Sequence, residues 1–179
     1  MKRIVCKFLV LMIALSALVH LSGGDEAIAQ SGQKARPAAA LPDGLFVKES
    51  IPRALGVKDA KEGTKQGDTV VIVGRIGGRP VPFVHGRAVF LLADETLLPC
   101  AEGCATPWDF CCTPPNIIME GLATVQVLGP DGRTLKTALQ NVNGLRPMAA
   151  VVVEGRVAKR DMNVFVVNAD RIYVKPPGK

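Results

Sequence analysis

The sequence predicts a mainly β domain of five strands, curled into a small barrel, with one long cysteine-rich loop between its second and third strands. Three patterns support this fold class: runs of β-branched residues separated by turn formers, a glycine inside the first and fourth runs, and four cysteines gathered between the second and third runs. The expected strands are 69–76, 88–94, 123–127, 150–157, and 163–174 with a bend near 168–170.

The first and fourth runs have similar sequences. Val70 to Arg75 and Val151 to Arg156 share the pattern Val-Val-x-x-Gly-Arg. Glycine inside a strand weakens the strand unless the chain bends or bulges there. We therefore expect Gly74 and Gly155 to mark two sharply coiled barrel strands.

The segments outside the runs are rich in turn formers. Gly77-Gly78-Arg79-Pro80, Gly129-Pro130-Asp131-Gly132 and Asn143-Gly144 are typical turn compositions. We expect a short helix around 138–142 and a helical turn around 59–62.

Three of these stretches carry a family resemblance. Gly67 to Ile76, Val151 to Val157 and Val166 to Ile172 together resemble the OB-fold superfamily, the five-stranded Greek-key barrel. The resemblance covers roughly 67–175 and is to exported bacterial OB-fold proteins of uncharacterised role. The chain departs from the family plan in its long loop from Asp94 to Leu122 and in the short segment 137–148, where such barrels usually carry a helix. A haem chaperone belongs to the same group, but its histidine motif has no counterpart here.

The N-terminal segment has the pattern of an export signal. A basic start with Lys2, Arg3 and Lys7 precedes an apolar run over 8–21, and Ala27-Ile28-Ala29 offers a cleavage site before Gln30. The apolar run is shorter than the roughly 20 residues of a membrane span. We therefore expect an exported, periplasmic or extracellular protein without a mature transmembrane segment, although a retained anchor is the alternative.

The expected organisation is a signal peptide at 1–29, a flexible spacer with a short N-terminal segment at 30–66, the barrel at 67–175, and a tail at 176–179. Residues 1–29 hold three of the 22 basic and two of the 16 acidic residues, so the mature chain has a net charge of +5. That charge favours anionic surfaces without identifying one.

The candidate site is the cysteine cluster of Cys100, Cys104, Cys111 and Cys112, spaced Cys-x3-Cys-x6-Cys-Cys. Two disulfides are one reading, because an exported chain with four cysteines has the redox compartment for them. A thiolate site for zinc or copper is the second reading. A redox-active pair is the third, although the Cys-x-x-Cys motif of thioredoxin-type centres is absent from the sequence. Adjacent cysteines point apart in an extended chain, so a single metal ion requires a tight turn there.

Other residues near the cluster have two readings each. Trp108 and Phe110 would form an aromatic lip over a ligand, or they would plug one end of the barrel and anchor the loop. His85, the sole histidine after 1–29, would supply a nitrogen ligand or would be an ordinary polar surface residue.

Several function classes lack support. No catalytic triad, phosphate-binding loop or dinucleotide fingerprint is present, so we do not expect an enzyme. Nucleic acid is not the expected ligand either, because Phe83, Phe90 and Phe165 are the strand aromatics available and alternation places at least two of them in the core.

The sequence therefore favours an exported, non-enzymatic binding or scaffolding module with a cysteine-clamped loop, whose partner would be a cell-envelope protein or a small ligand. One alternative is a thiolate protein for zinc or copper. The other is a barrel that binds oligosaccharide or single-stranded nucleic acid.

Overall fold

The computed structural model describes residues 39–100 and 103–177. Within them the strands are β1 (Leu55–Gly56), β2 (Thr69–Ile76), β3 (Val89–Ala93), β4 (Leu122–Gln126), β5 (Ala150–Arg160) and β6 (Phe165–Val174). The helices are α1 (Val57–Gly63), the 3-10 helix η1 (Pro107–Asp109) and α2 (Pro115–Glu120). The expected signal peptide and the start of the expected spacer lie outside the described residues.

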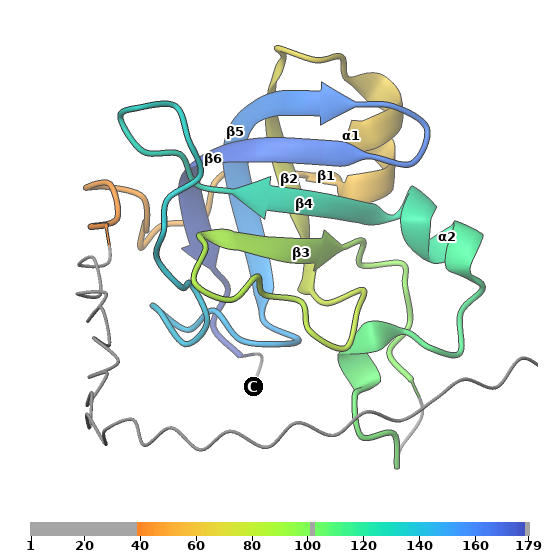
Figure 1. The fold of residues 1–179 in the computed structure, drawn as a ribbon. Coiled ribbons are helices and arrows are strands. Elements are labelled where there is room, and N and C mark those ends of the chain that lie inside the picture. The colour runs from red at the N-terminus through yellow and green to blue at the C-terminus, as the bar shows by residue number, and fades with distance from the viewer. Residues whose placement is uncertain (1–38, 101–102, 178–179) are drawn as a thin grey trace, which may run out of the picture. The chain divides into compact units, whose positions relative to one another are not determined.

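Strands β2 to β6 close into a barrel, as Figure 1 shows. β2 pairs antiparallel with β3 at one edge and with β5 at the other, where Thr69 faces Arg156 and Arg75 faces Ala150. β3 pairs antiparallel with β4, β5 pairs antiparallel with β6, and β4 completes the circuit by pairing parallel with β6. This order is that of a five-stranded OB-like Greek-key barrel, as the sequence predicts.

Both strand glycines lie where backbones approach each other too closely for a side chain. A Cβ on Gly74 would collide with the carbonyl oxygen of Ala93, and one on Gly155 would collide with that of Asn168. The β5–β6 register shifts beside Gly155, where Glu154 faces Arg171 and Gly155 faces Ala169, so Asp170 is the extra residue of a bulge. The bulge predicted for the fourth run is therefore present beside Gly155, whereas Gly74 allows the close approach of the Ala93 backbone.

The barrel interior is filled by apolar side chains that alternate along the strands. β2 alternates regularly, with Val70, Ile72 and Ile76 buried on the inner face. Phe90 and Phe165 are among the largest of the fully buried side chains. One continuous cluster joins these residues to the rest of the barrel core.

The segment before the barrel packs onto it. Leu45 and Val57 belong to the main core cluster. The Val47 N–H donates to the carbonyl oxygen of Ile172 at 3.0 Å, and β1 pairs parallel with β2. The helical turn expected around 59–62 forms as part of α1. From Leu45 onward the chain is thus an integral part of the folded unit.

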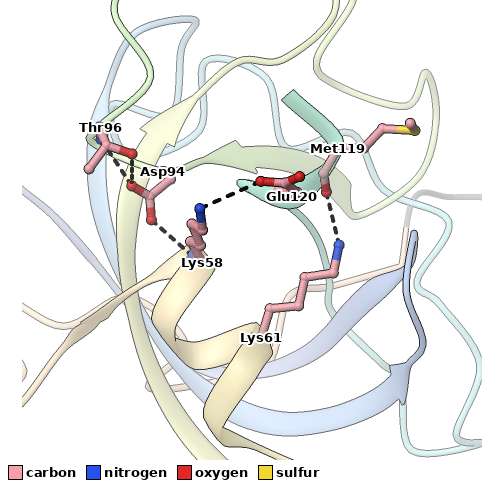
Figure 2. Close-up of polar contacts among 6 residues, drawn as sticks. All are labelled: Lys58, Lys61, Asp94, Thr96, Met119 and Glu120. Carbon is pink, nitrogen blue, oxygen red and sulfur yellow. Dashed lines mark hydrogen bonds and ion pairs between the residues drawn. The ribbon is translucent and has the colours of Figure 1, made fainter. Parts of the chain in front are cut away.

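Figure 2 shows how α1 is held against neighbouring elements. The buried carboxylate of Asp94, just after β3, accepts the backbone N–H of Lys58 at 2.9 Å and both the N–H and the hydroxyl of Thr96. Burial raises the pKa of Asp94, but the hydrogen bonds from Thr96 and Lys58 outweigh it and the net shift is downward. Asp94 therefore caps the start of α1 from a distant part of the chain.

The other contacts in Figure 2 join α1 to α2. The Lys61 amine is buried and donates to the Met119 carbonyl oxygen at 2.9 Å, while Lys58 pairs with Glu120 at 3.5 Å. Burial lowers the pKa of Lys61. A cation at the carboxyl end of a helix is favourable, so Lys61 stabilises the end of α2.

The short helix expected around 138–142 is absent from the described structure. This stretch forms turns in which Asn141 and Asn143 have positive φ, a conformation that interrupts a right-handed helix. Leu139 and Leu145 are buried in the main core cluster, so side chains from an irregular segment cover this part of the barrel. No helix among residues 39–100 and 103–177 is long and apolar enough to cross a membrane.

Candidate metal centre

The cysteines lie in the segment between β3 and β4, which are neighbouring barrel strands. The two ends of this segment meet at its base, where the Asp94 N–H donates to the Gly121 carbonyl oxygen at 2.8 Å. η1 and α2 lie within the segment, and neither was expected from the sequence. The long connection is therefore a structured excursion from the barrel that begins and ends at one point.

Phe110 anchors this loop. Its side chain is fully buried in a small cluster with Ala93 and Leu97, and Ile118 and Leu122 pack against that cluster. This cluster is separate from the main barrel core, as is common under long loops. Since Phe110 has no exposed surface, it serves as an anchor and does not form an open lip.

Trp108 is held beside the turn that follows β2. Its indole N–H donates to the Pro80 carbonyl oxygen at 3.0 Å, and its own carbonyl accepts the Gly78 N–H at 2.7 Å. A Cβ on Gly77 would lie 2.5 Å from the same Trp108 carbonyl oxygen, so this approach requires glycine. Trp108 itself is half-buried, and it ties the loop to the barrel while leaving part of its ring in solvent.

A tight turn brings the adjacent cysteines to one corner of the loop. The Thr113 N–H donates to the Phe110 carbonyl oxygen at 2.8 Å, which places Cys111 and Cys112 at the two central positions. Phe110 has a left-handed backbone, with φ of +56°, and this turns the chain as it leaves η1. The turn required for neighbouring cysteines to approach a common centre is therefore present.

Three of the sulfurs lie together. Cys111 Sγ is 3.3 Å from Cys100 Sγ and 3.9 Å from Cys104 Sγ. Asp109 completes the group, and one ligand atom from each of these four residues lies within 4.8 Å of every other. The structure thus gathers three of the four predicted cysteines and adds a carboxylate.

Asp109 also organises the loop. One carboxylate oxygen accepts the Cys111 N–H at 2.9 Å and lies 3.8 Å from Cys100 Sγ. The other accepts the Thr106 hydroxyl at 2.8 Å. The Thr106 hydroxyl is the main cause of the lowered pKa of Asp109. The sequence analysis missed this role, although Thr106-x-x-Asp109 between two cysteines is a spacing at which a local side-chain bond forms.

The thiols have different proton affinities. The backbone N–H of Cys112 lowers the pKa of the Cys100 thiol, and the Cys111 side chain adds to this effect. The contact with Cys100 is the main cause of the raised pKa of Cys111, and the same partner raises that of Cys112. Of these three thiols, Cys100 is therefore the one that most readily becomes a thiolate, which is the form that binds metal.

The remaining predicted ligands lie outside the four-atom group. Cys112 is exposed and is excluded from it. His85 is exposed on the turn before β3 and is likewise outside the group. A nitrogen ligand from His85 is therefore not part of this arrangement.

The sulfur separations fit a shared metal better than a bond between sulfurs. A disulfide needs about 2.05 Å, and no two sulfurs among the described cysteines are bonded. With metal–sulfur bonds near 2.3 Å, sulfurs at two corners of a tetrahedron are about 3.8 Å apart. The Cys104–Cys111 separation of 3.9 Å is close to that value, and the Cys100–Cys111 separation of 3.3 Å is shorter. The group can therefore accept a thiophilic ion with small side-chain movements.

The residues considered for nucleic acid have structural roles in this fold. Phe83, Phe90 and Phe165 are buried, so none of them offers a stacking face. Arg156 donates to the Gly67 carbonyl oxygen and Arg160 to that of Lys61. Both arginines therefore have partners within the chain.

Surface grooves lie away from the cysteines. One of about 400 Å³ is bordered by Asn143, Arg146, Val174 and Lys175, and another of about 450 Å³ is bordered by 47–52 and Arg171. Neither groove borders a cysteine.

No protein-family model matches the chain, and no curated protein matches it. Among solved structures, the hypothetical protein ygiW from E. coli is similar at 14% identity and a TM-score of 0.36, over 65% of this chain and 85% of that chain. A likeness at this level supports no conclusion about function, and the fold assignment rests on the strand pairing of the barrel itself.

Proposed function

We propose that this protein is an exported, non-enzymatic OB-fold module that binds a thiophilic metal ion, zinc or copper(I), in its cysteine loop. The observation that carries the proposal is the convergence of Cys100, Cys104, Cys111 and Asp109, whose ligand atoms all lie within 4.8 Å of one another. The barrel supports this loop at its base and at Phe110. Export follows from the N-terminal pattern and makes the periplasm or the cell exterior the place of action.

The donor set explains the choice of ion. Thiolates select soft or borderline cations such as Cu(I) and Zn²⁺, whereas Mg²⁺ and Ca²⁺ require oxygen ligands. Metal-bound thiolates are commonly held by neighbouring groups. Here the Cys112 N–H lowers the pKa of Cys100, and Asp109 holds the backbone of Cys111. The loop therefore has both ligands and the groups that orient them.

A disulfide-clamped module is the second candidate, and one observation favours it. Cys100 Sγ and Cys111 Sγ are 3.3 Å apart, closer than sulfurs on a tetrahedral edge, so a small movement would allow a bond between them. An oxidising compartment would supply the oxidant for that bond. The loop would then be a structural staple, with its partner-binding surface elsewhere.

Intact mass of the exported protein, native and then denatured with thiol alkylation, separates the two candidates. Metal binding predicts four alkylated thiols and a native mass excess matching zinc or copper. Two disulfides predict no alkylation and a loss of about four hydrogens. Blocked thiols without bound metal would contradict the metal proposal.

Cys104→Ser sharpens the result, with Ala105→Ser as the matched control on an exposed neighbour in the same loop. A metal site predicts that C104S lowers metal stoichiometry under reducing conditions while A105S keeps it. A disulfide staple predicts that C104S lowers stability under oxidising conditions only. If C104S changed neither quantity, Cys104 would have no part in either arrangement.

A further inference from the structure

We propose that a groove beside the end of β6 binds an extended acidic peptide segment of a partner protein, which adds to the sheet at Val174. The groove borders no cysteine, so this binding does not depend on the metal site. Two features of the groove point to this occupant. One is a strand edge with open hydrogen-bonding groups, and the other is a basic lining.

The groove follows the last residues of β6 as they leave the barrel. It consists of two adjoining cavities of about 400 and 410 Å³, which share Asn143, Val174 and Pro176 in their lining. Residues of the 143–150 segment border one cavity, and residues 46–48 border the other. This β6 groove therefore runs along the strand, as a bound extended peptide would.

The direction of the Val174 backbone groups follows from the pairing of β6 with β5. The Lys175 N–H donates to the Ala150 carbonyl oxygen at 2.9 Å, so the backbone groups of Lys175 face β5. Hydrogen-bonding directions alternate along an antiparallel strand. The N–H and C=O of Val174 therefore face away from β5, on the same side as those of Ile172.

On that side the strand has a partner only as far as Ile172. The Ile172 N–H donates to the Leu45 carbonyl oxygen at 2.6 Å, and the Ile172 carbonyl accepts the Val47 N–H. Among the described residues, no backbone group bonds Val174 from this side. Its N–H and C=O are therefore available to one residue of an added strand, which is the way an extended peptide joins a sheet edge.

The lining of the β6 groove is basic. It contains Lys48, Arg146 and Lys175 and no aspartate or glutamate. Among the described residues, Lys48 and Arg146 have no ion-pair partner, whereas Lys175 pairs with Glu95 at 3.2 Å. Both side chains of that pair are more than a third exposed, and such pairs contribute little stability. A carboxylate of a bound peptide can therefore take the place of Glu95.

The strand edge favours a peptide over other anions. Val174 packs its side chain against the main core cluster, so alternation directs Tyr173 and Lys175 outward, where both line the groove. A peptide can use the Val174 backbone groups and the basic side chains together. An acidic oligosaccharide can use the charges but cannot continue the backbone pairing of the sheet.

The test measures binding of a fluorescein-labelled octapeptide of alternating Glu and Val to the mature protein by fluorescence anisotropy. An octapeptide of alternating Lys and Val is the charge control. Two further acidic peptides carry N-methyl groups on alternate residues, one on each edge of the strand. The acidic peptide is expected to bind and the basic one not to. One of the two N-methylated peptides is expected to bind about tenfold more weakly, because it cannot donate to the sheet.

Variants locate the binding site. Lys48→Glu and Arg146→Glu are each expected to weaken binding of the acidic peptide about tenfold, because reversing a charge replaces attraction with repulsion. Lys65→Glu is the matched control with the same change in net charge. Lys65 is exposed and lies before the end of β2 that pairs with Arg156, whereas Ala150, in the lining, pairs with the other end of β2. It should bind like the wild type, and circular dichroism checks that each variant is folded.

Three results would overturn the proposal while leaving the metal site untouched. The first is equal binding, or no binding, of the acidic and basic peptides. The second is unchanged affinity of both N-methylated peptides, which would reduce the interaction to charge alone. The third is a fluorescein-labelled oligogalacturonate that binds more tightly than the acidic peptide and loses affinity in K48E and R146E, which would make the groove a saccharide site.

Discussion

The barrel of this protein buries many more apolar side chains than its cysteine loop does. The barrel core is one large cluster of buried apolar side chains, which come from the five strands and from the segment before them. Among its described residues, the loop contributes the buried Leu97 and Phe110 to a small separate cluster that also contains Ala93. The barrel is therefore stabilised by many shared contacts, whereas the loop depends on few.

This difference indicates how stability and function are divided. Regions with few buried apolar contacts open at lower free energy than the core. Ligands that bind only the folded loop would stabilise it by mass action. A metal ion bound by Cys100, Cys104 and Cys111 would therefore add to the stability of the loop.

The largest effect is expected from the barrel. Phe90→Ala removes a fully buried ring from β3, and Phe→Ala changes in cores cost about 3–5 kcal/mol. The free energy of unfolding should fall by that amount in a single transition that includes both the sheet and the loop. Phe90→Leu, which keeps most of the volume, should lose much less. A loss for F90A below about 1 kcal/mol would show that this core is less tightly packed than the burial indicates.

A smaller, local loss of stability is expected from a substitution in the loop. Phe110→Ala should cost about 2–3 kcal/mol, less than the roughly 3–5 kcal/mol typical of a buried ring, because the loop can separate from the barrel and relax. Hydrogen exchange should increase over 103–121 and remain slow in β2 and β5. Metal affinity should fall with it, since Cys111 follows Phe110 directly. Equal loss of protection in the barrel strands would contradict the division between the two regions.

The smallest effect is expected at the junction of the two regions. Asp94→Asn weakens the hydrogen bonds to Lys58 and Thr96 and should cost about 1–2 kcal/mol at neutral pH. The folded-state pKa of Asp94 lies below its unfolded value, so its contribution is present above about pH 4 and is lost as pH falls through the folded-state pKa. Unfolding free energy measured against pH should therefore fall less steeply for D94N than for wild type. Parallel curves would mean that Asp94 does not stabilise the folded state through its charge.

The sequence by itself determined the barrel. β-branched runs with turns between them are local patterns, and they located all five barrel strands to within one or two residues at most ends. The repeated Val-Val-x-x-Gly-Arg pattern also located two close backbone approaches, at Gly74 and Gly155, because only glycine leaves room for them. The short helix expected around 138–142 was wrong because Asn141 and Asn143 adopt left-handed conformations that composition alone does not reveal.

For the cysteine site, the tertiary structure determined more than the sequence did. Its residue types and spacing were visible in the sequence, but only the tertiary structure decided that Asp109 joins Cys100, Cys104 and Cys111 while Cys112 lies outside. This arrangement of the four residues depends on the left-handed backbone at Phe110. The backbone is held there because the Phe110 ring is buried beside Ala93 and Leu97. Contacts between distant segments set the geometry of the loop, and such contacts carry no local period from which a sequence could predict them.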